Sequence, residues 1–183
     1  MPRLNAIDPN TATGKTKELL DGVKAKLGVV PNLMRTFANS TAVLESYLNF
    51  SGSLAGGLLS PRLREEIALV VAEANSCQYC LSAHTVIGKM VGLSESEITS
   101  SRQIYSHDAK EDAALKFAYQ IVLKRGEISD AEFRAVQDAG FTEGEIAEII
   151  TNVALNIFTN YFNHIAQTEV DFPKVSFGAK AGN

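Results

Sequence analysis

The chain has 183 residues, of which 45% are hydrophobic and 21% are charged, a composition typical of a globular protein with one sizeable core. Its formal net charge of -4, from 17 Lys and Arg against 21 Asp and Glu, gives no electrostatic basis for binding nucleic acid or an acidic membrane surface. The longest strictly apolar run, residues 67–72, is far shorter than the roughly 20 residues that span a membrane. We therefore expect one domain without nucleic-acid or membrane partners.

Apolar residues recur three and four positions apart in nearly every segment, and there is no convincing stretch of strict apolar–polar alternation bounded by hairpin turns. This periodicity predicts an all-α, single-domain helical bundle. In chain order, we expect helices at about residues 14–27, 41–55, 61–75, 77–91, 95–101, 109–125, 130–139 and 143–168. Residues 28–32 are expected to form a loop, since the residue before Pro31 avoids the helical region.

Several helix ends carry recognisable signals. Three segments begin with a capping box, in which a hydroxyl and a carboxylate satisfy free backbone amides: Ser94 with Glu97, Ser129 with Glu132, and Thr142 with Glu145. Ser60 and Pro61 mark another start. Glycines follow four of the periodic stretches, at Gly28, Gly92, Gly126 and Gly140.

The two ends of the chain differ from the helical part. We expect residues 1–172 to form the helical domain and residues 173–183, which show little periodicity, to be poorly ordered or to contact a partner subunit. The first residues contain one arginine, Arg3, and no apolar stretch behind it, unlike a secretory signal. A cytoplasmic location is therefore expected.

The only two cysteines, Cys77 and Cys80, are separated by two residues. Two cysteines exclude a disulfide scaffold, and in a reducing compartment this spacing favours a catalytic or metal-binding pair. If the segment is helical, Cys77, Cys80 and His84 share one stripe of the helix. The spacing also brings the two Cα atoms to about 5 Å, which a disulfide tolerates. This geometry is typical of a redox-active dithiol.

A reactive thiol needs help to ionise, because an unperturbed cysteine with a pKa of about 8.5 is mostly protonated at neutral pH. Asn75 and Ser76 are predicted to break one helix and cap the next, so that a helix N-terminus lies near both cysteines. His84 can accept the thiol proton. The preceding helix offers Glu65 and Glu73 to orient the histidine, and because their neighbours are apolar, at least one is expected to be paired.

The pattern Glu65, eleven residues, Cys77-Gln78-Tyr79-Cys80, three residues, His84 resembles the signature of the alkylhydroperoxidase D-like branch of the carboxymuconolactone decarboxylase superfamily. Residues 31–35 and 156–163 resemble the flanks of peroxidase-related members, so the resemblance covers about residues 28–172. It implies an all-helical fold and selects Glu65 over Glu73.

The resemblance also implies roles. Cys80 would be the peroxidatic thiolate that attacks a hydroperoxide and becomes a sulfenic acid, Cys77 would resolve it as a 77–80 disulfide, and Glu65 and His84 would form the proton relay. The implied partners are a hydroperoxide substrate, an external dithiol or lipoyl-type reductant, and further copies of the chain in a trimer or hexamer; no bound cofactor or metal is implied. Well-understood members have a histidine where this sequence has Tyr79.

Other readings of these residues stay open. The chain could be a carboxymuconolactone-type decarboxylase, a non-catalytic redox-sensing oligomer, or a zinc protein that binds through Cys77, Cys80 and His84 with Glu65 or His164, although a second Cys/His pair is missing. The two thiols could also be small core residues. The polar residues near the end of the last helix, Asn156, Asn160, Asn163 and His164, either satisfy one another or line a pocket, and we favour the structural role.

Overall fold

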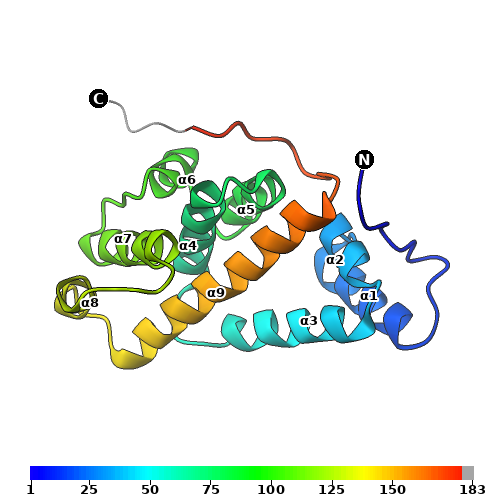
Figure 1. The fold of residues 1–183 in the computed structure, drawn as a ribbon, viewed down its shortest axis with the longest axis horizontal. Coiled ribbons are helices and arrows are strands. Elements are labelled where there is room, and N and C mark those ends of the chain that lie inside the picture. Colours follow the sequence, from blue (N-terminus) through cyan, green and yellow to red (C-terminus); the bar gives the residue numbers. More distant parts are fainter. Residues whose placement is uncertain (179–183) are drawn as a thin grey trace.

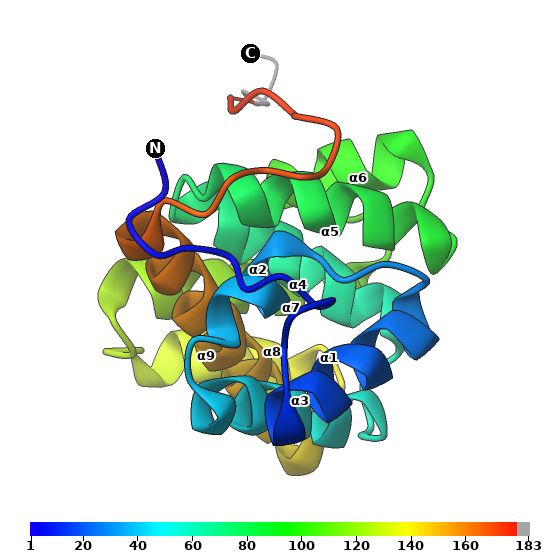
Figure 2. The ribbon, with the colours of Figure 1, turned by 90° about the vertical axis from the view of Figure 1, so that its right-hand side faces the viewer.

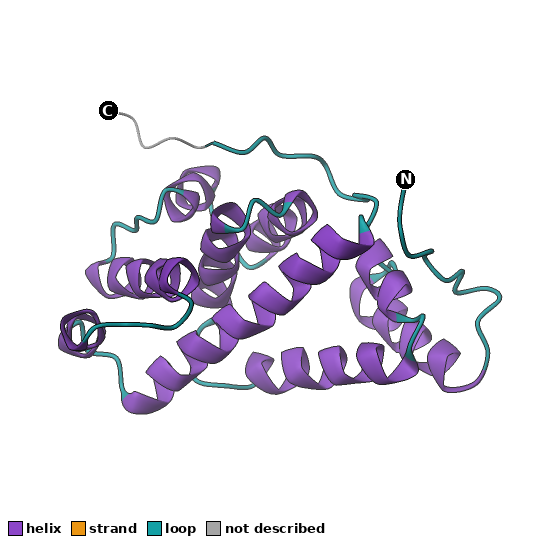
Figure 3. Ribbon diagram, in the orientation of Figure 1, coloured by secondary structure: helices purple, strands orange, loops and turns teal. Residues whose placement is uncertain are grey.

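The structure, a computed structural model, describes residues 1–178 and contains in that part nine α-helices and no strand (Figures 1 and 3). The helices are α1 Gly14–Leu27, α2 Asn32–Phe37, α3 Thr41–Ala55, α4 Pro61–Ala74, α5 Gln78–Met90, α6 Glu95–Arg102, α7 Ala109–Lys124, α8 Asp130–Asp138 and α9 Glu143–Ala166. The all-α prediction is confirmed, and the eight expected helices match observed ones closely.

The helix ends follow from the local sequence. Ser60 caps α4 by accepting a hydrogen bond from the Leu63 amide, with proline at the first helical position. All three predicted capping boxes, at the starts of α6, α8 and α9, are present. Gly28 ends α1 in the left-handed region, at φ 76°, where a residue without Cβ is unstrained.

One helix was missed. Helix α2 begins at Asn32, directly after Pro31, so the loop predicted for residues 28–32 extended one residue too far and no helix was expected behind it. Proline restricts the residue before it and favours a helix after it. With six residues, α2 is too short to show periodicity, and its stability comes from burying Leu33, Met34 and Phe37.

Helix α4 lies at the centre of the molecule and packs against α5, α6, α7 and α9 (Figure 1). Leu69 and Ala72 on one face join a core cluster that also holds both cysteines and residues of α1 and α2. Ile67 and Val70 on another face join a second cluster built mainly with α7 and α9. The two faces of α4 therefore look into two separate parts of the core.

The segment after α9, residues 169–178, is called the C-terminal strap below. Figure 2 shows it running along α5 on the outside of the helices. Gln78 Nε2 donates to the Val175 carbonyl at 2.6 Å, Arg102 donates to the Ser176 carbonyl at 2.7 Å, and the Gly178 amide donates to Glu73 at 2.8 Å. The described part of the expected tail thus contacts its own chain, and residues 179–183 lie outside the described residues.

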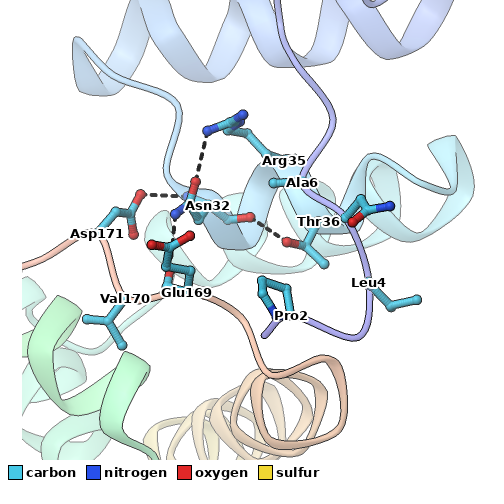
Figure 4. Close-up of a pocket in the computed structure, with 10 residues that line it drawn as sticks. Pro2, Leu4, Ala6, Asn32, Arg35, Thr36, Glu169, Val170 and Asp171 are labelled. Carbon is cyan, nitrogen blue, oxygen red and sulfur yellow. Dashed lines mark hydrogen bonds between the residues drawn. The ribbon is translucent and has the colours of Figure 1, made fainter.

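Both terminal segments meet over α2 (Figure 4). Asp171 of the strap accepts a hydrogen bond from the Asn32 amide at 2.7 Å, and Asn32 Nδ2 donates to the Glu169 carbonyl at 3.1 Å. Arg35 donates to Asn32 Oδ1 at 2.9 Å, beside a polar cavity of about 380 Å³. These bonds tie the strap to the first turn of α2. Within residues 1–178, no helix has the length and apolar character needed to cross a membrane.

Candidate active site

The cysteine pair lies at a tight elbow between α4 and α5. Asn75 ends α4, Ser76 adopts a left-handed conformation at φ 52°, and the Cys77 amide donates back to the Ala72 carbonyl at 2.9 Å. Cys77 itself is the N-cap of α5, and its Sγ accepts a hydrogen bond from the Cys80 amide at 3.4 Å. The predicted cap at Asn75 and Ser76 was therefore early by one residue. Both sulfurs still lie at the positive end of the α5 dipole.

The two cysteines form a disulfide, with their Cα atoms 5.4 Å apart. Cys77 is 1% exposed and Cys80 is 2% exposed. The surroundings of the two sulfurs differ, because Cys80 lines a cavity and Cys77 is not among its lining residues. A molecule in the cavity would therefore meet Cys80 first.

Glu65 and His84 form a close pair across α4 and α5. His84 Nδ1 lies 2.7 Å from Glu65 Oε2, and both side chains are largely buried. Glu73, the other carboxylate considered from the sequence, instead accepts a hydrogen bond from Arg102 Nε at 2.9 Å on another face of the helix. A carboxylate that holds Nδ1 fixes the orientation of the imidazole and leaves Nε2 to exchange protons.

The cavity that contains these groups has a volume of about 480 Å³, within the usual range for small-molecule sites. Its walls come from α1 to α5, α9 and the strap, and they are mostly aliphatic and aromatic. Glu65, Cys80 and His84 all line it. Its other polar lining residues are Lys26, Tyr47, Ser51, Arg64, Tyr79, Asn152, Asn156 and Thr159.

Polar residues of α9 contact the cysteine elbow. Asn75 Nδ2 donates to Asn160 Oδ1 at 3.0 Å, and His164 Nε2 lies 2.9 Å from the Asn75 carbonyl oxygen. Asn163 Nδ2 donates to Cys80 Sγ at 3.3 Å. His164 is thus a structural contact of the elbow, whereas Asn163 reaches the sulfur and Asn156 lines the cavity. These polar residues of α9 were noticed in the sequence, but none of them was predicted to contact a cysteine.

The zinc alternative has no geometric support. Over residues 1–178, no group of three or more His, Cys, Asp or Glu side chains is arranged to hold a metal ion. His84 and His164 bind different partners, Glu65 and the Asn75 carbonyl.

Part of this chain is similar to a known protein family. The profile of the carboxymuconolactone decarboxylase family matches residues 41–120, a segment that contains Glu65, Cys77, Cys80 and His84. No match was found among the curated proteins.

Several solved structures share the fold of this chain. A peroxidase-related protein from Ralstonia eutropha JMP134, with an alkylhydroperoxidase AhpD core, has a TM-score of 0.84 and 21% identity over 93% of this chain and 92% of that chain. A peroxidase-related protein from Silicibacter sp. TM1040 has a TM-score of 0.79 and 24% identity over 92% and 94%. The debrominase Bmp8, in a cysteine-to-alanine variant with 2,3,4-tribromopyrrole, has a TM-score of 0.80 and 17% identity over 92% and 91%. The predicted helical fold is confirmed, and the family match over residues 41–120 supports the predicted superfamily for that segment.

Tyr79 stands at the position where the resemblance leads one to expect a histidine. Its hydroxyl accepts a hydrogen bond from the Leu33 amide at 3.0 Å, and its ring packs edge-on against Phe172 of the strap at 5.6 Å. Burial raises the pKa of Tyr79, and the nearby Asp171 raises it further. Tyr79 thus ties α5 to α2 and the strap, and it stays protonated where an imidazole would titrate.

Proposed function

We propose that this protein is a thiol peroxidase that reduces organic hydroperoxides through the Cys77–Cys80 dithiol. One observation carries the proposal: Cys80 lines a largely apolar cavity together with the Glu65–His84 pair, while Cys77, which is disulfide-bonded to Cys80, does not line it. Nucleophile, proton relay and resolving thiol are thus assembled around one space that can hold a substrate.

In the proposed reaction, the Cys80 thiolate attacks the terminal oxygen of the hydroperoxide. A sulfur–oxygen bond forms, the oxygen–oxygen bond breaks, and the departing alkoxide takes a proton through His84 and leaves as the alcohol. The Cys77 thiolate then attacks the sulfur of the Cys80 sulfenic acid. The disulfide forms and hydroxide leaves as water after protonation. One hydroperoxide thus consumes two thiols.

The cavity supports an organic substrate over hydrogen peroxide. A volume of about 480 Å³ with mostly apolar walls holds a molecule with a sizeable hydrocarbon part, whose burial contributes to binding. Regeneration requires an external dithiol, for which a lipoyl-type donor is our proposal, in a reducing compartment such as the cytoplasm. The buried disulfide fits a donor that enters the same cavity better than one that docks on the outer surface.

We also propose that copies of the chain associate through α9. Phe158, Tyr161 and Ile165 follow one another at helical spacing and are 39%, 55% and 68% exposed. An exposed apolar stripe on a helix is typical of a subunit interface. Light scattering on the purified protein gives the subunit number, expected to be three or six.

The decisive test of the peroxidase proposal is the Cys80→Ser variant. It is expected to lose hydroperoxide reduction, whereas Cys77→Ser retains the first step and accumulates Cys80 sulfenic acid, which a sulfenate-trapping reagent detects by mass spectrometry. In the wild-type protein, one equivalent of hydroperoxide should remove two thiols. Undiminished turnover by Cys80→Ser, or no thiol loss in the wild type, contradicts the proposal.

The apolar cavity beside a dithiol also favours a second candidate, the reductive removal of halogen from an aromatic ring. Two thiols would supply the electrons, so that the aryl halide yields the arene, halide and the 77–80 disulfide. Halide release assayed on a brominated pyrrole distinguishes this activity from hydroperoxide reduction. Turnover of a carboxylated lactone by the Cys77/Cys80 double variant would instead support the decarboxylase alternative.

A further inference from the structure

Asn163 is the one side chain outside the CxxC segment whose hydrogen bond to a cysteine sulfur is seen in residues 1–178. It is 5% exposed on α9, and its Nδ2 lies 3.3 Å from Cys80 Sγ. The neighbouring contacts of Asn160 and His164 with Asn75 hold this turn of α9 against the elbow. The direction of the amide is therefore set by two rigid helices.

The two sulfurs receive different hydrogen bonds. Cys77 Sγ accepts one from the Cys80 backbone amide and belongs to the N-cap residue of α5, where the helix dipole is strongest. Backbone geometry alone therefore favours ionisation of Cys77, the sulfur that does not line the cavity. Cys80 Sγ receives its hydrogen bond from Asn163.

The amide of Asn163 is retained at a cost to stability. Its Oδ1 is buried and has no hydrogen-bond partner among the described residues. An unsatisfied buried oxygen disfavours folding, and a leucine of similar volume would avoid it in this apolar cluster. A donor that reaches the sulfur is what the amide provides and a hydrocarbon does not.

We infer that Asn163 selects Cys80, rather than Cys77, as the ionised thiol of the reduced protein, by donating a hydrogen bond to its sulfur. This deepens the proposed function, because it explains how the sulfur that faces the cavity becomes the nucleophile. The charged side chains that share the cavity with Cys80 are Lys26, Arg64, Glu65 and His84. None of them has a hydrogen bond to either sulfur among the described residues.

The experiment labels the fully reduced protein with limiting iodoacetamide at neutral pH and identifies the alkylated cysteine by mass spectrometry. In the wild type, Cys80 is expected to be labelled first. In Asn163→Leu, Cys80 labelling should slow about tenfold while Cys77 labelling changes little, so that the order reverses. In a Cys77→Ser background, Asn163→Leu should raise the midpoint of the Cys80 alkylation profile by about one pH unit.

Controls distinguish the loss of the Asn163 hydrogen-bond donor from a change in side-chain packing. Asn163→Ala removes the same donor with less bulk and should shift labelling in the same direction, and in urea all variants should label at equal rates. The midpoint temperature of thermal unfolding of Asn163→Leu should be no lower than that of the wild type. An unchanged labelling order and midpoint in both variants overturns the inference. If the wild type labels at Cys80 but does not reduce hydroperoxide, the proposed function fails and the role of Asn163 stands.

Discussion

Two adjacent carboxylates of α4 have opposite surroundings. Glu65 lines the cavity and binds His84 Nδ1 at 2.7 Å. Glu66 is 2% exposed, and its Oε2 has no hydrogen-bond partner among the described residues. The Ser101 hydroxyl lies 3.5 Å from its Oε1. One carboxylate therefore has a partner for its charge, and the other has almost none.

The difference follows from helix geometry. Consecutive residues point about 100° apart on an α-helix, so Glu65 and Glu66 look into the two different parts of the core that α4 separates. Burial, together with the nearby charges of Glu111 and Glu97, raises the pKa of Glu66 to about 7 against the lowering effect of Arg62. A carboxylate in this helix is therefore not a catalytic candidate by itself. It becomes a candidate only on the face that lines the cavity.

The largest effect is expected from substituting Glu65, the carboxylate that lines the cavity. Glu65→Gln keeps a hydrogen-bond acceptor for His84 but removes the negative charge beside the imidazole. We expect kcat/KM for an organic hydroperoxide to fall about 100-fold, within the usual contribution of general acid–base catalysis. Initial rates measured across the neutral pH range check this.

Glu66→Gln is the matched control for that rate measurement. It makes the same chemical change one residue along the helix, and kcat/KM should stay within about twofold of the wild type, because Glu66 does not line the cavity. Equal losses in the two variants would show that the change acts through helix stability, and the proton relay would then have to be reassigned.

Glu66, on the other face of the helix, should affect the free energy of unfolding rather than the reaction rate. Below pH 4.5, Glu66 is protonated in both the folded and the unfolded chain; between pH 4.5 and about 7 only the folded chain keeps the proton. The free energy of unfolding should therefore fall as the pH rises through this range, by about 3 kcal/mol at most, and stay level above it. Urea titrations at several pH values measure the slope.

Glu66→Gln carries no titratable proton and should flatten this fall. Glu65→Gln should keep it, since Glu66 is unchanged there. A wild-type stability that is constant between pH 4.5 and 7 would contradict the neutral, buried state of Glu66.

Much of the fold is encoded locally and could be predicted. The capping boxes at Ser94, Ser129 and Thr142 place hydroxyl and carboxylate within four residues, so the sequence contains the whole interaction. The Glu65–His84 pair was also predicted, although 19 residues separate its members, because a resemblance supplied the spacing. Long amphipathic helices and one recognisable motif therefore gave the architecture and the centre of the site.

Contacts between distant segments could not be predicted in this way. Asn163 is 83 residues from Cys80, and Tyr79 is 46 residues from Leu33, whose amide it binds. Helix α2 depends on burial rather than on its own six residues. The raised pKa of Glu66 likewise depends on its burial and on the carboxylates of Glu111 in α7 and Glu97 in α6. No local pattern contains these partners.

The third carboxylate of α4 gives the smallest expected effect. Glu73 binds Arg102 Nε at 2.9 Å in a pair whose side chains are 18% and 10% exposed, and Arg102 also holds the Ser176 carbonyl at 2.7 Å. Arg102→Met should lower the free energy of unfolding by about 1–2 kcal/mol, less than the loss of a fully buried pair. It should also speed amide hydrogen exchange in the strap at residues 175–178.

Lys89→Met provides the control for this change, because Lys89 and Glu95 form an ion pair whose side chains are 50% and 86% exposed. Exposed pairs contribute little, so neither stability nor exchange in the strap should change measurably. If Arg102→Met behaves like Lys89→Met, the Glu73–Arg102 pair does not hold the strap. If exchange rises only in Arg102→Met, the Glu73–Arg102 pair holds the strap against α4 and α6.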